Sequence, residues 1–250
     1  MNDLFQEISG ECSKITTRKY STSFSLGIKM LNTNLHIPIY SIYGFVRLAD
    51  EIVDSLHDFN QKDLLHNFET ECYDAIKNKI SMNPILNSFQ YVVNHYKIDL
   101  KLIDQFLYSM KMDLDKKKYY NKLEYDKYIL GSAEVVGLMC LKVFVKGNED
   151  NYKKLTPFAE KLGAAFQKIN FLRDIKNDYE ELGRTYFPNI KIESLDVIQK
   201  KEIEANIEAD FKEGLKGIKM LPNSSRGGVY LAYIYYLELL KKIKKMKPKY

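Results

Sequence analysis

The sequence predicts an all-α protein, and three observations support that prediction. Apolar residues recur with the 3.6-residue period of a helix along most of the 250-residue chain. Only 6 Pro and 12 Gly interrupt this pattern, whereas an all-β chain needs a turn signal about every 8–12 residues. Hydrophobic residues make up 45% of the chain and charged residues 28%, as in globular proteins with a packed core. We therefore expect a helical bundle around an apolar interior.

The periodicity also predicts the individual helices. In chain order they are expected at residues 3–20, 36–58, 61–79, 84–96, 99–114, 122–146, 149–182, 195–216 and 225–246. Pro84 and Pro157 suit first-turn positions, and Ser224 or Ser225 suits the N-cap of the last helix. Residues 183–194 break the pattern and are expected to be irregular. Because no linker or change in composition divides the chain, a single domain over residues 1–250 is predicted.

Cysteine, histidine and charge patterns exclude several classes of protein. The three cysteines form no CxxC pair and the four histidines lack metal-binding spacing, which argues against a disulfide framework or a zinc site. The sequence shows no secretory leader and no apolar run of about 20 residues, so a cytoplasmic protein is expected. The net charge of +5 is too small to indicate a nucleic-acid partner. The basic stretch at residues 241–250 leaves peripheral membrane contact open, and we expect a monomer or a weak dimer.

Two predicted helices carry a narrow polar stripe on an otherwise apolar surface. The first stripe occupies an arc of about 60° at 100° per residue. The stripes consist of Tyr43, Arg47, Asp50 and Asp54 in the first helix, and of Gln167, Asn170, Asp174 and Asp178 in the second. A helix that is apolar on most sides is normally buried, and buried carboxylates are costly without a cation. A surface helix would explain one such stripe, but it explains two matching stripes poorly.

The stripes therefore predict a cation site between two antiparallel helices that face each other across a cavity. Asp and Asn oxygens without His or Cys suit a hard cation, Mg²⁺ in particular. Arg47, Arg173, Arg184 and Tyr186 are close in sequence to the stripes, and guanidinium groups bind phosphate oxygens in pairs. The residues thus indicate a Mg²⁺–diphosphate site in an apolar bundle, for a substrate with a diphosphate head and an apolar body.

These segments resemble the phytoene/squalene synthase family. RLADEIVD (residues 47–54) and GAAFQKINFLRDIKNDYEELGRTYFP (residues 163–188) resemble its two Asp-rich signatures. YSTSFSLGIKML (residues 20–31), YILGSAEVVGLM (residues 128–139) and YLELL (residues 236–240) resemble three further segments in the same order. Among family members, the bacterial phytoene synthases are the expected group. In that group a basic segment follows YLELL, so a C-terminal truncation of this chain stays open.

The resemblance implies the helical isoprenoid synthase fold and a prenyl transferase. The implied reaction joins two geranylgeranyl diphosphates head to head, through a cyclopropylcarbinyl diphosphate, to give phytoene for carotenoid biosynthesis. The alternative joins two farnesyl diphosphates to dehydrosqualene, or to squalene with NADPH. A non-catalytic relative that acts as an assembly factor is a third possibility, although such relatives have lost the Asp-rich signatures. A class I terpene cyclase is a weaker option.

The resemblance also implies roles for individual residues. Mg²⁺, or Mn²⁺ in its place, would be held by Asp50, Asp54, Asn170, Asp174 and Asp178. The four aspartates are expected to act in catalysis with Tyr43 and Arg47. Substrate contacts are implied for Tyr20, Ser21, Ser23, Phe24, Gln167, Arg173, Arg184, Tyr186 and Tyr236. The small residues Gly131, Ala133 and Gly137 either leave room for prenyl tails or allow close helix packing.

Overall fold

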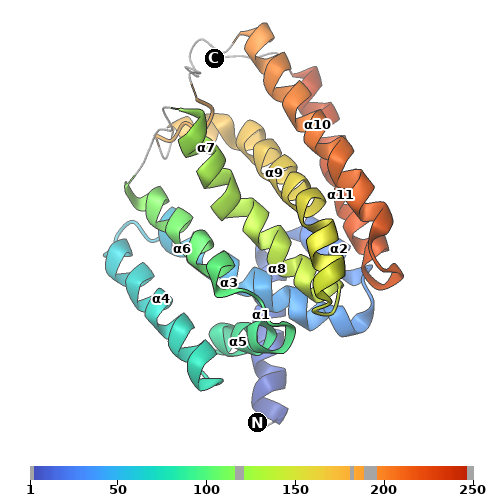
Figure 1. Ribbon diagram of the computed structural model, residues 1–250. Coiled ribbons are helices and arrows are strands. Elements are labelled where there is room, and N and C mark those ends of the chain that lie inside the picture. Colours follow the sequence, from blue (N-terminus) through green and yellow to red (C-terminus); the bar gives the residue numbers. More distant parts are fainter. Residues whose placement is uncertain (1–2, 116–120, 181–182, 189–195, 247–250) are drawn as a thin grey trace.

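The computed structural model describes residues 3–115, 121–180, 183–188 and 196–246. These residues form long helices, as predicted (Figure 1), and the helices enclose a central cavity. The elements are α1 (Asp3–Tyr20), α2 (Thr22–Lys29), a 3₁₀ turn (Thr33–Leu35), α3 (His36–Asp54), α4 (Gln61–Asn78), α5 (Pro84–Tyr96), α6 (Leu100–Asp115), α7 (Lys122–Ile129), a π turn (Leu130–Glu134), α8 (Val135–Phe144), α9 (Glu149–Glu180), α10 (Val197–Met220) and α11 (Asn223–Lys245). The single domain expected over residues 1–250 stays a prediction.

The observed bounds correct the sequence prediction in several places. Helix α2 was not predicted, because it has only eight residues and a Ser/Thr-rich start. Its N-cap is Ser21, whose side chain accepts a hydrogen bond from the Phe24 N–H at 3.3 Å. The helix predicted at residues 36–58 ends at Asp54, and α10 continues to Met220. The helix predicted at residues 122–146 is divided by the π turn and ends at Phe144.

Two predicted helix starts are wrong. Pro157 lies inside α9, because that helix already begins at Glu149. The N-cap of α11 is Pro222 rather than a serine, and the Ser225 hydroxyl donates to the Pro222 carbonyl at 3.2 Å. Of the stretch predicted to be irregular, residues 183–188 are non-helical as expected, whereas residues 189–194 lie outside the described part. Residues 181–182, predicted as helix, also lie outside it.

Two clusters of buried apolar side chains hold the helices in place. The first joins α3 to α5, α6 and α8, and its centre is Phe45, whose ring stacks on Phe89 at 3.9 Å and lies 5.4 Å from Phe106. The second joins α9, α10 and α11 around Phe211 and Ile207. Burial of each such side chain stabilises the fold by about 1.5–3 kcal/mol. Members of both clusters line the central cavity, so the two clusters fix the positions of α3 and α9 on its walls.

The π turn (Leu130–Glu134) packs unusually close to α6. A Cβ added to Gly131 would lie 2.6 Å from both the Gln105 carbonyl oxygen and the Ser109 hydroxyl of α6. Only glycine fits there without displacing α6. The close-packing interpretation therefore holds for Gly131, whereas Ala133 and Gly137 line the cavity.

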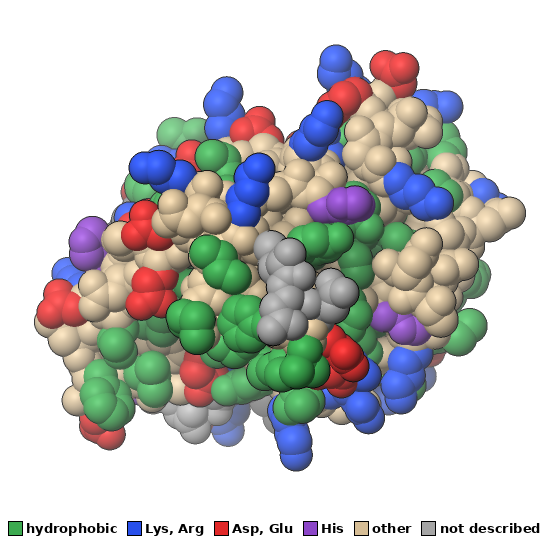
Figure 2. Space-filling view, turned by 90° about the horizontal axis from the view of Figure 1, so that it is seen from below, with side chains coloured by type: hydrophobic (Ala, Val, Ile, Leu, Met, Phe, Trp, Pro, Cys, Tyr) green, Lys and Arg blue, Asp and Glu red, His purple; other side chains and the backbone are tan. Residues whose placement is uncertain are grey.

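The described surface carries charges of both signs. On the face shown in Figure 2, Lys and Arg side chains alternate with Asp and Glu, and hydrophobic side chains gather between them. None of the helices in the described ranges is long and apolar enough to traverse a lipid bilayer. The expectation that the protein has no nucleic-acid partner stays a prediction.

The contact at Gly131 predicts a stability effect. Gly131→Ala should lower the free energy of unfolding by about 1–3 kcal/mol, because the added methyl overpacks the contact with α6. Gly227→Ala is the control, since its added Cβ meets only the Met30 carbonyl oxygen at 3.8 Å and alanine favours a helix. Urea unfolding followed by circular dichroism measures both. Equal midpoints for Gly131→Ala and wild type would contradict the packing assignment.

Candidate active site

Every side chain assigned to the site from sequence lines one central cavity of about 490 Å³. These residues are Tyr20, Ser21, Ser23, Phe24, Tyr43, Arg47, Asp50, Asp54, Gln167, Asn170, Arg173, Asp174, Asp178, Arg184, Tyr186 and Tyr236. They come from the α1–α2 corner, α3, α9, the segment after α9, and α11. The structure thus brings together residues that are more than 200 positions apart in the chain. Their chemical roles stay predictions.

The two acidic helices run in the same direction, so the antiparallel arrangement predicted from sequence is wrong. At one end of the cavity, Arg184 donates its backbone N–H to the Asp178 carbonyl and its side chain to Asp54, which places the C-terminal ends of α9 and α3 together. Earlier turns of the same two helices also face each other, because the Phe24 ring lies 4.6 Å from Tyr43 of α3 and 6.0 Å from Tyr236, and Tyr236 stacks on Phe166 of α9 at 4.1 Å. Both helix dipoles therefore point their negative ends at the acidic groups, which makes this end attractive to cations.

The cavity changes from polar to apolar along its length. The carboxylates lie at the C-terminal ends of α3 and α9, whereas Leu141, Phe144, Leu155, Phe158 and Leu221 line the opposite part. Asp174 and Leu155 are 19 residues apart on α9, which corresponds to about 28 Å at 1.5 Å per residue. The charged residues of the described lining lie toward this carboxylate end, and the rest of the described lining suits an extended hydrocarbon chain. We call this end the mouth; its charged residues are Arg47, Asp50, Asp54, Asp113, Arg173, Asp174, Asp178 and Arg184.

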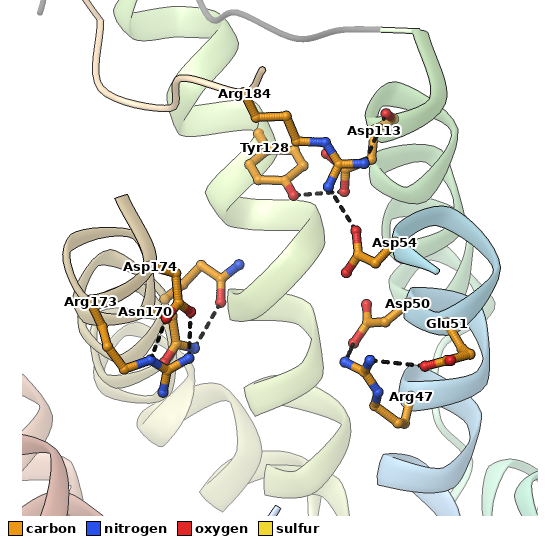
Figure 3. A network of polar contacts seen from close by, with 11 residues as sticks. Arg47, Asp50, Glu51, Asp54, Asp113, Tyr128, Asn170, Arg173, Asp174 and Arg184 are labelled. Atoms are coloured by element: carbon orange, nitrogen blue, oxygen red, sulfur yellow. Dashed lines mark hydrogen bonds and ion pairs between the residues drawn. The ribbon is translucent and has the colours of Figure 1, made fainter. Parts of the chain in front are cut away.

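On α3, the side chain of Arg47 contacts two acidic side chains. Arg47 Nη1 lies 3.6 Å from Asp50 Oδ2, and Arg47 Nη2 donates to Glu51 Oε2 at 3.1 Å (Figure 3). The same guanidinium lies over the Tyr20 ring, 4.4 Å from its centroid. Burial, followed by the charge of Asp54, raises the pKa of Asp50 to about 7. The buried Nε–H of Arg47 has no hydrogen-bond partner among the described residues, so it is available to an anion in the cavity.

On α9, arginine also neutralises only part of the negative charge of Asp174 and Asp178. Arg173 donates to both carboxylate oxygens of Asp174, at 2.7 and 2.5 Å. Burial, followed by the charge of Asp174, raises the pKa of Asp178 to about 6. The Tyr236 hydroxyl donates to Asn170 Oδ1 at 3.3 Å, and the Asn170 amide donates to Gln167 Oε1 at the same distance. This chain of hydrogen bonds orients the amide oxygen of Asn170.

The segment after α9 connects the two acidic helices across the mouth. Arg184 is 7% exposed, and its Nη1 donates to Asp54 Oδ1 at 2.7 Å (Figure 3). Tyr186 anchors the segment, because its ring stacks on Phe171 at 3.9 Å and on Tyr128 at 5.6 Å. Burial raises the pKa of the Tyr186 hydroxyl, which therefore stays protonated.

Asp113 on α6 also lines the mouth, and it was missed in the sequence. It is 8% exposed, and its Oδ2 accepts a hydrogen bond from the Tyr128 hydroxyl at 2.7 Å. The sequence did contain a pattern that indicates burial of Asp113, because Phe106, Met110 and Asp113 follow the helical spacing of one buried face. In contrast, Arg226 lies outside the lining and donates to the Leu221 carbonyl at 2.8 Å.

The donor set suits a hard divalent cation. Among the described lining residues, five aspartates face three arginines, so carboxylates outnumber guanidinium groups, and the raised pKa values of Asp50 and Asp178 reflect incomplete neutralisation. Within the described ranges, no three His, Cys, Asp or Glu side chains are close enough to hold a metal by themselves. Mg²⁺ commonly binds through one or two carboxylates and completes its shell with water and substrate phosphate. The residues therefore fit Mg²⁺ that arrives with a diphosphate.

Comparisons with known proteins agree with this geometry. The family model of squalene/phytoene synthase matches residues 17–249. Phytoene synthase 1 of Solanum lycopersicum is 24% identical over 96% of this chain, which spans 62% of that relative. The 4,4'-diapophytoene synthase of Staphylococcus haemolyticus is 26% identical over 77% of this chain and 67% of its own length. The chain belongs to the squalene/phytoene synthase family.

Solved structures show the same fold. A squalene synthase from Alicyclobacillus acidocaldarius superposes with a TM-score of 0.81 at 20% identity, over 96% of this chain and 94% of its own. A dehydrosqualene synthase in complex with a ligand gives a TM-score of 0.81 at 22% identity, over 97% of both chains. The predicted all-α isoprenoid synthase fold is confirmed.

The partly buried charge of Asp50 predicts a pH-dependent stability difference. The folded carboxyl takes up its proton at about pH 7, against a usual pKa of 3.8. The charge of this group therefore costs stability as the pH rises between these values, and the full cost remains above pH 7. With metal removed by EDTA, Asp50→Asn should be more stable than wild type by about 1–3 kcal/mol at about pH 8.

Urea unfolding at about pH 5 and about pH 8 measures this difference, which should shrink at the lower pH. Asp58→Asn, at an exposed position beyond the end of α3, is the control and should change little. A stability gain of the same size at both pH values would show that the charge of Asp50 is not the cause.

Proposed function

We propose that this protein catalyses the Mg²⁺-dependent head-to-head condensation of two prenyl diphosphates. The observation that carries the proposal is the deep apolar cavity with two carboxylate stripes at one end. Such a cavity holds a hydrocarbon chain in its apolar part and a diphosphate at its mouth. The carboxylates Asp50, Asp54, Asp174 and Asp178, with the amide oxygen of Asn170, are the proposed ligands of Mg²⁺ or Mn²⁺.

The remaining mouth residues are proposed to bind and orient the diphosphates. Bound Mg²⁺ would stabilise the charge of the leaving diphosphate. The unpaired Nε–H of Arg47 and the guanidinium of Arg173 are the proposed donors to its oxygens. The hydroxyls of Ser21 and Ser23, which lie 3.4 Å apart at the start of α2, add two neutral donors. Tyr20, whose ring faces Arg47, would hold that guanidinium toward the cavity.

The middle of the cavity is proposed as the place where the carbon–carbon bond forms. Departure of diphosphate leaves an allylic cation, and the double bond of the second substrate attacks it. The resulting cation loses a proton to the released diphosphate and closes to a cyclopropylcarbinyl diphosphate. Departure of the second diphosphate, rearrangement and loss of one more proton then give the hydrocarbon. The rings of Phe24, Tyr43, Phe166 and Tyr236 surround this region, and aromatic faces stabilise cations. Burial raises the pKa of Tyr43 well above its usual value, so its hydroxyl stays neutral. The apolar wall excludes water that would quench the cation.

We propose geranylgeranyl diphosphate as the substrate and phytoene as the product, in carotenoid biosynthesis. The depth of the cavity and the likeness to phytoene synthases over 96% of the chain support this choice. The second candidate uses farnesyl diphosphate, and the relative named 4,4'-diapophytoene synthase favours it. NADPH is proposed as a cofactor only in the variant of that reaction that ends at squalene.

Product analysis separates the two candidates. Incubation with geranylgeranyl diphosphate and Mg²⁺ should give phytoene with or without NADPH. Farnesyl diphosphate should be turned over at least about tenfold more slowly, as expected when a substrate fills the apolar wall incompletely. Mass spectrometry of the extracted hydrocarbon identifies the product. A hydrocarbon formed only from farnesyl units would exclude the geranylgeranyl assignment and leave the condensation intact.

Loss of a proposed metal ligand should abolish turnover without unfolding the protein. Asp174→Asn is expected to lower Mg²⁺-dependent diphosphate release by about a hundredfold or more, because it removes charge from the mouth. Asp126→Asn, exposed on α7, is the matched control and should keep wild-type activity. Unchanged release from Asp174→Asn would reject the site, and no release from wild type with any prenyl diphosphate would favour the assembly-factor alternative.

For its surroundings, we propose a cytoplasmic monomer or weak dimer that contacts membranes peripherally and binds no nucleic acid. The basic C-terminal residues and the lipid-soluble product support membrane contact, although residues 247–250 lie outside the described part.

A further inference from the structure

The mouth of the cavity holds a buried arginine between two carboxylates. Arg184 Nη1 donates to Asp54 Oδ1 at 2.7 Å, and Arg184 Nη2 lies 3.3 Å from the backbone carbonyls of Val53 and Asp113. Figure 3 shows the Asp113 side chain beside the same guanidinium. Arg184 and Asp113 are 7% and 8% exposed, whereas the Asp54 side chain is 37% exposed. The two carboxylates therefore differ in their access to the cavity.

This difference matters because the proposed function gives Asp54 a second partner. If Asp54 ligates Mg²⁺, it can no longer serve fully as the counter-ion of Arg184. A buried guanidinium without a counter-ion is costly, so Arg184 would then compete with the cation for Asp54. Asp113 belongs to α6 and Asp54 to α3, so a cation bound to Asp54 leaves the Asp113 carboxylate in its place beside the Arg184 guanidinium.

Asp113 is itself held firmly. Its Oδ2 accepts from the Tyr128 hydroxyl at 2.7 Å, and Tyr128 is 3% exposed. The Tyr128 ring packs against Phe171 of α9 at 6.0 Å and against Tyr186 at 5.6 Å. The position of the Asp113 side chain is therefore set by contacts with α7 and, through Tyr128, with α9. It does not depend on the acidic stripe of α3.

We propose that Asp113 is a positioning residue: it is the permanent counter-ion of Arg184, and it thereby frees Asp54 to exchange Arg184 for a divalent cation. This inference rests on the proposed function. Without Asp113, Arg184 depends on Asp54 alone, and the cation must displace it. Loss of Asp113 should therefore raise the Mg²⁺ requirement of the site, and this effect should act through Arg184.

A double-mutant cycle tests the proposal by binding alone. Inorganic diphosphate is titrated calorimetrically into the full chain at a series of Mg²⁺ concentrations, and the Mg²⁺ concentration at half-maximal binding is recorded. Asp113→Asn should raise this concentration by about fivefold or more. In the Arg184→Gln background the same substitution should change it by less than about twofold, because the competing guanidinium is gone.

The control is Asp115→Asn on the same helix, where an exposed carboxylate pairs with Lys62 at 2.7 Å, and it should not change the Mg²⁺ requirement. An equal increase from Asp113→Asn in both backgrounds, or no increase in the wild-type background, would overturn the proposal, since a merely structural role needs no Arg184.

If Asp113→Asn does not fold, Tyr128→Phe replaces it in the cycle. It keeps both charges and should raise the requirement about twofold, again only when Arg184 is present. An unchanged requirement would overturn the proposal.

The outcome is independent of the condensation reaction, because no prenyl chain or turnover enters the measurement. Wild-type protein that binds no diphosphate at any Mg²⁺ concentration overturns this inference, whereas the condensation is judged by its hydrocarbon product.

Discussion

The architecture depends on one electrostatic constraint, which is the clustering of several partly buried carboxylates at one end of an apolar cavity. Burial and mutual repulsion raise the pKa of Asp50 and of Asp178, and the C-terminal dipoles of α3 and α9 add negative potential at the same place. Arginines from three segments partly neutralise this charge. The remaining excess explains why the cavity has the properties of a cation site, even though the described carboxylates do not form a closed metal cage.

The parallel direction of α3 and α9 follows from the same constraint. Because both stripes end at the C-terminal end of their helices, only a parallel arrangement brings the carboxylates to one mouth and leaves the earlier turns apolar. The aromatic side chains Phe24, Tyr43, Phe166 and Tyr236 then lie between the mouth and the apolar depth. A polar head and a hydrocarbon tail are thereby separated along a single cavity.

The segment after α9, which contains Arg184 and Tyr186, lines the mouth together with α3 and α9. Arg184 connects the end of α9 to Asp54 of α3, and Asp113 of α6 supports it from behind. Stacking of Tyr186 on Phe171 anchors this segment to α9. Charge at the mouth is therefore controlled by four segments, and a change in one of them affects the others.

Most of the helices and both polar stripes were predictable from the sequence, although the short helix α2 and the π turn were not. Helical periodicity places residues such as Asp50 and Asp54 on one face whatever packs against it. The relative direction of α3 and α9, the close approach at Gly131 and the place of Asp113 beside Arg184 were not predictable from the sequence. Each of these depends on contacts between segments far apart in the chain, about which the local period of a single helix carries no information.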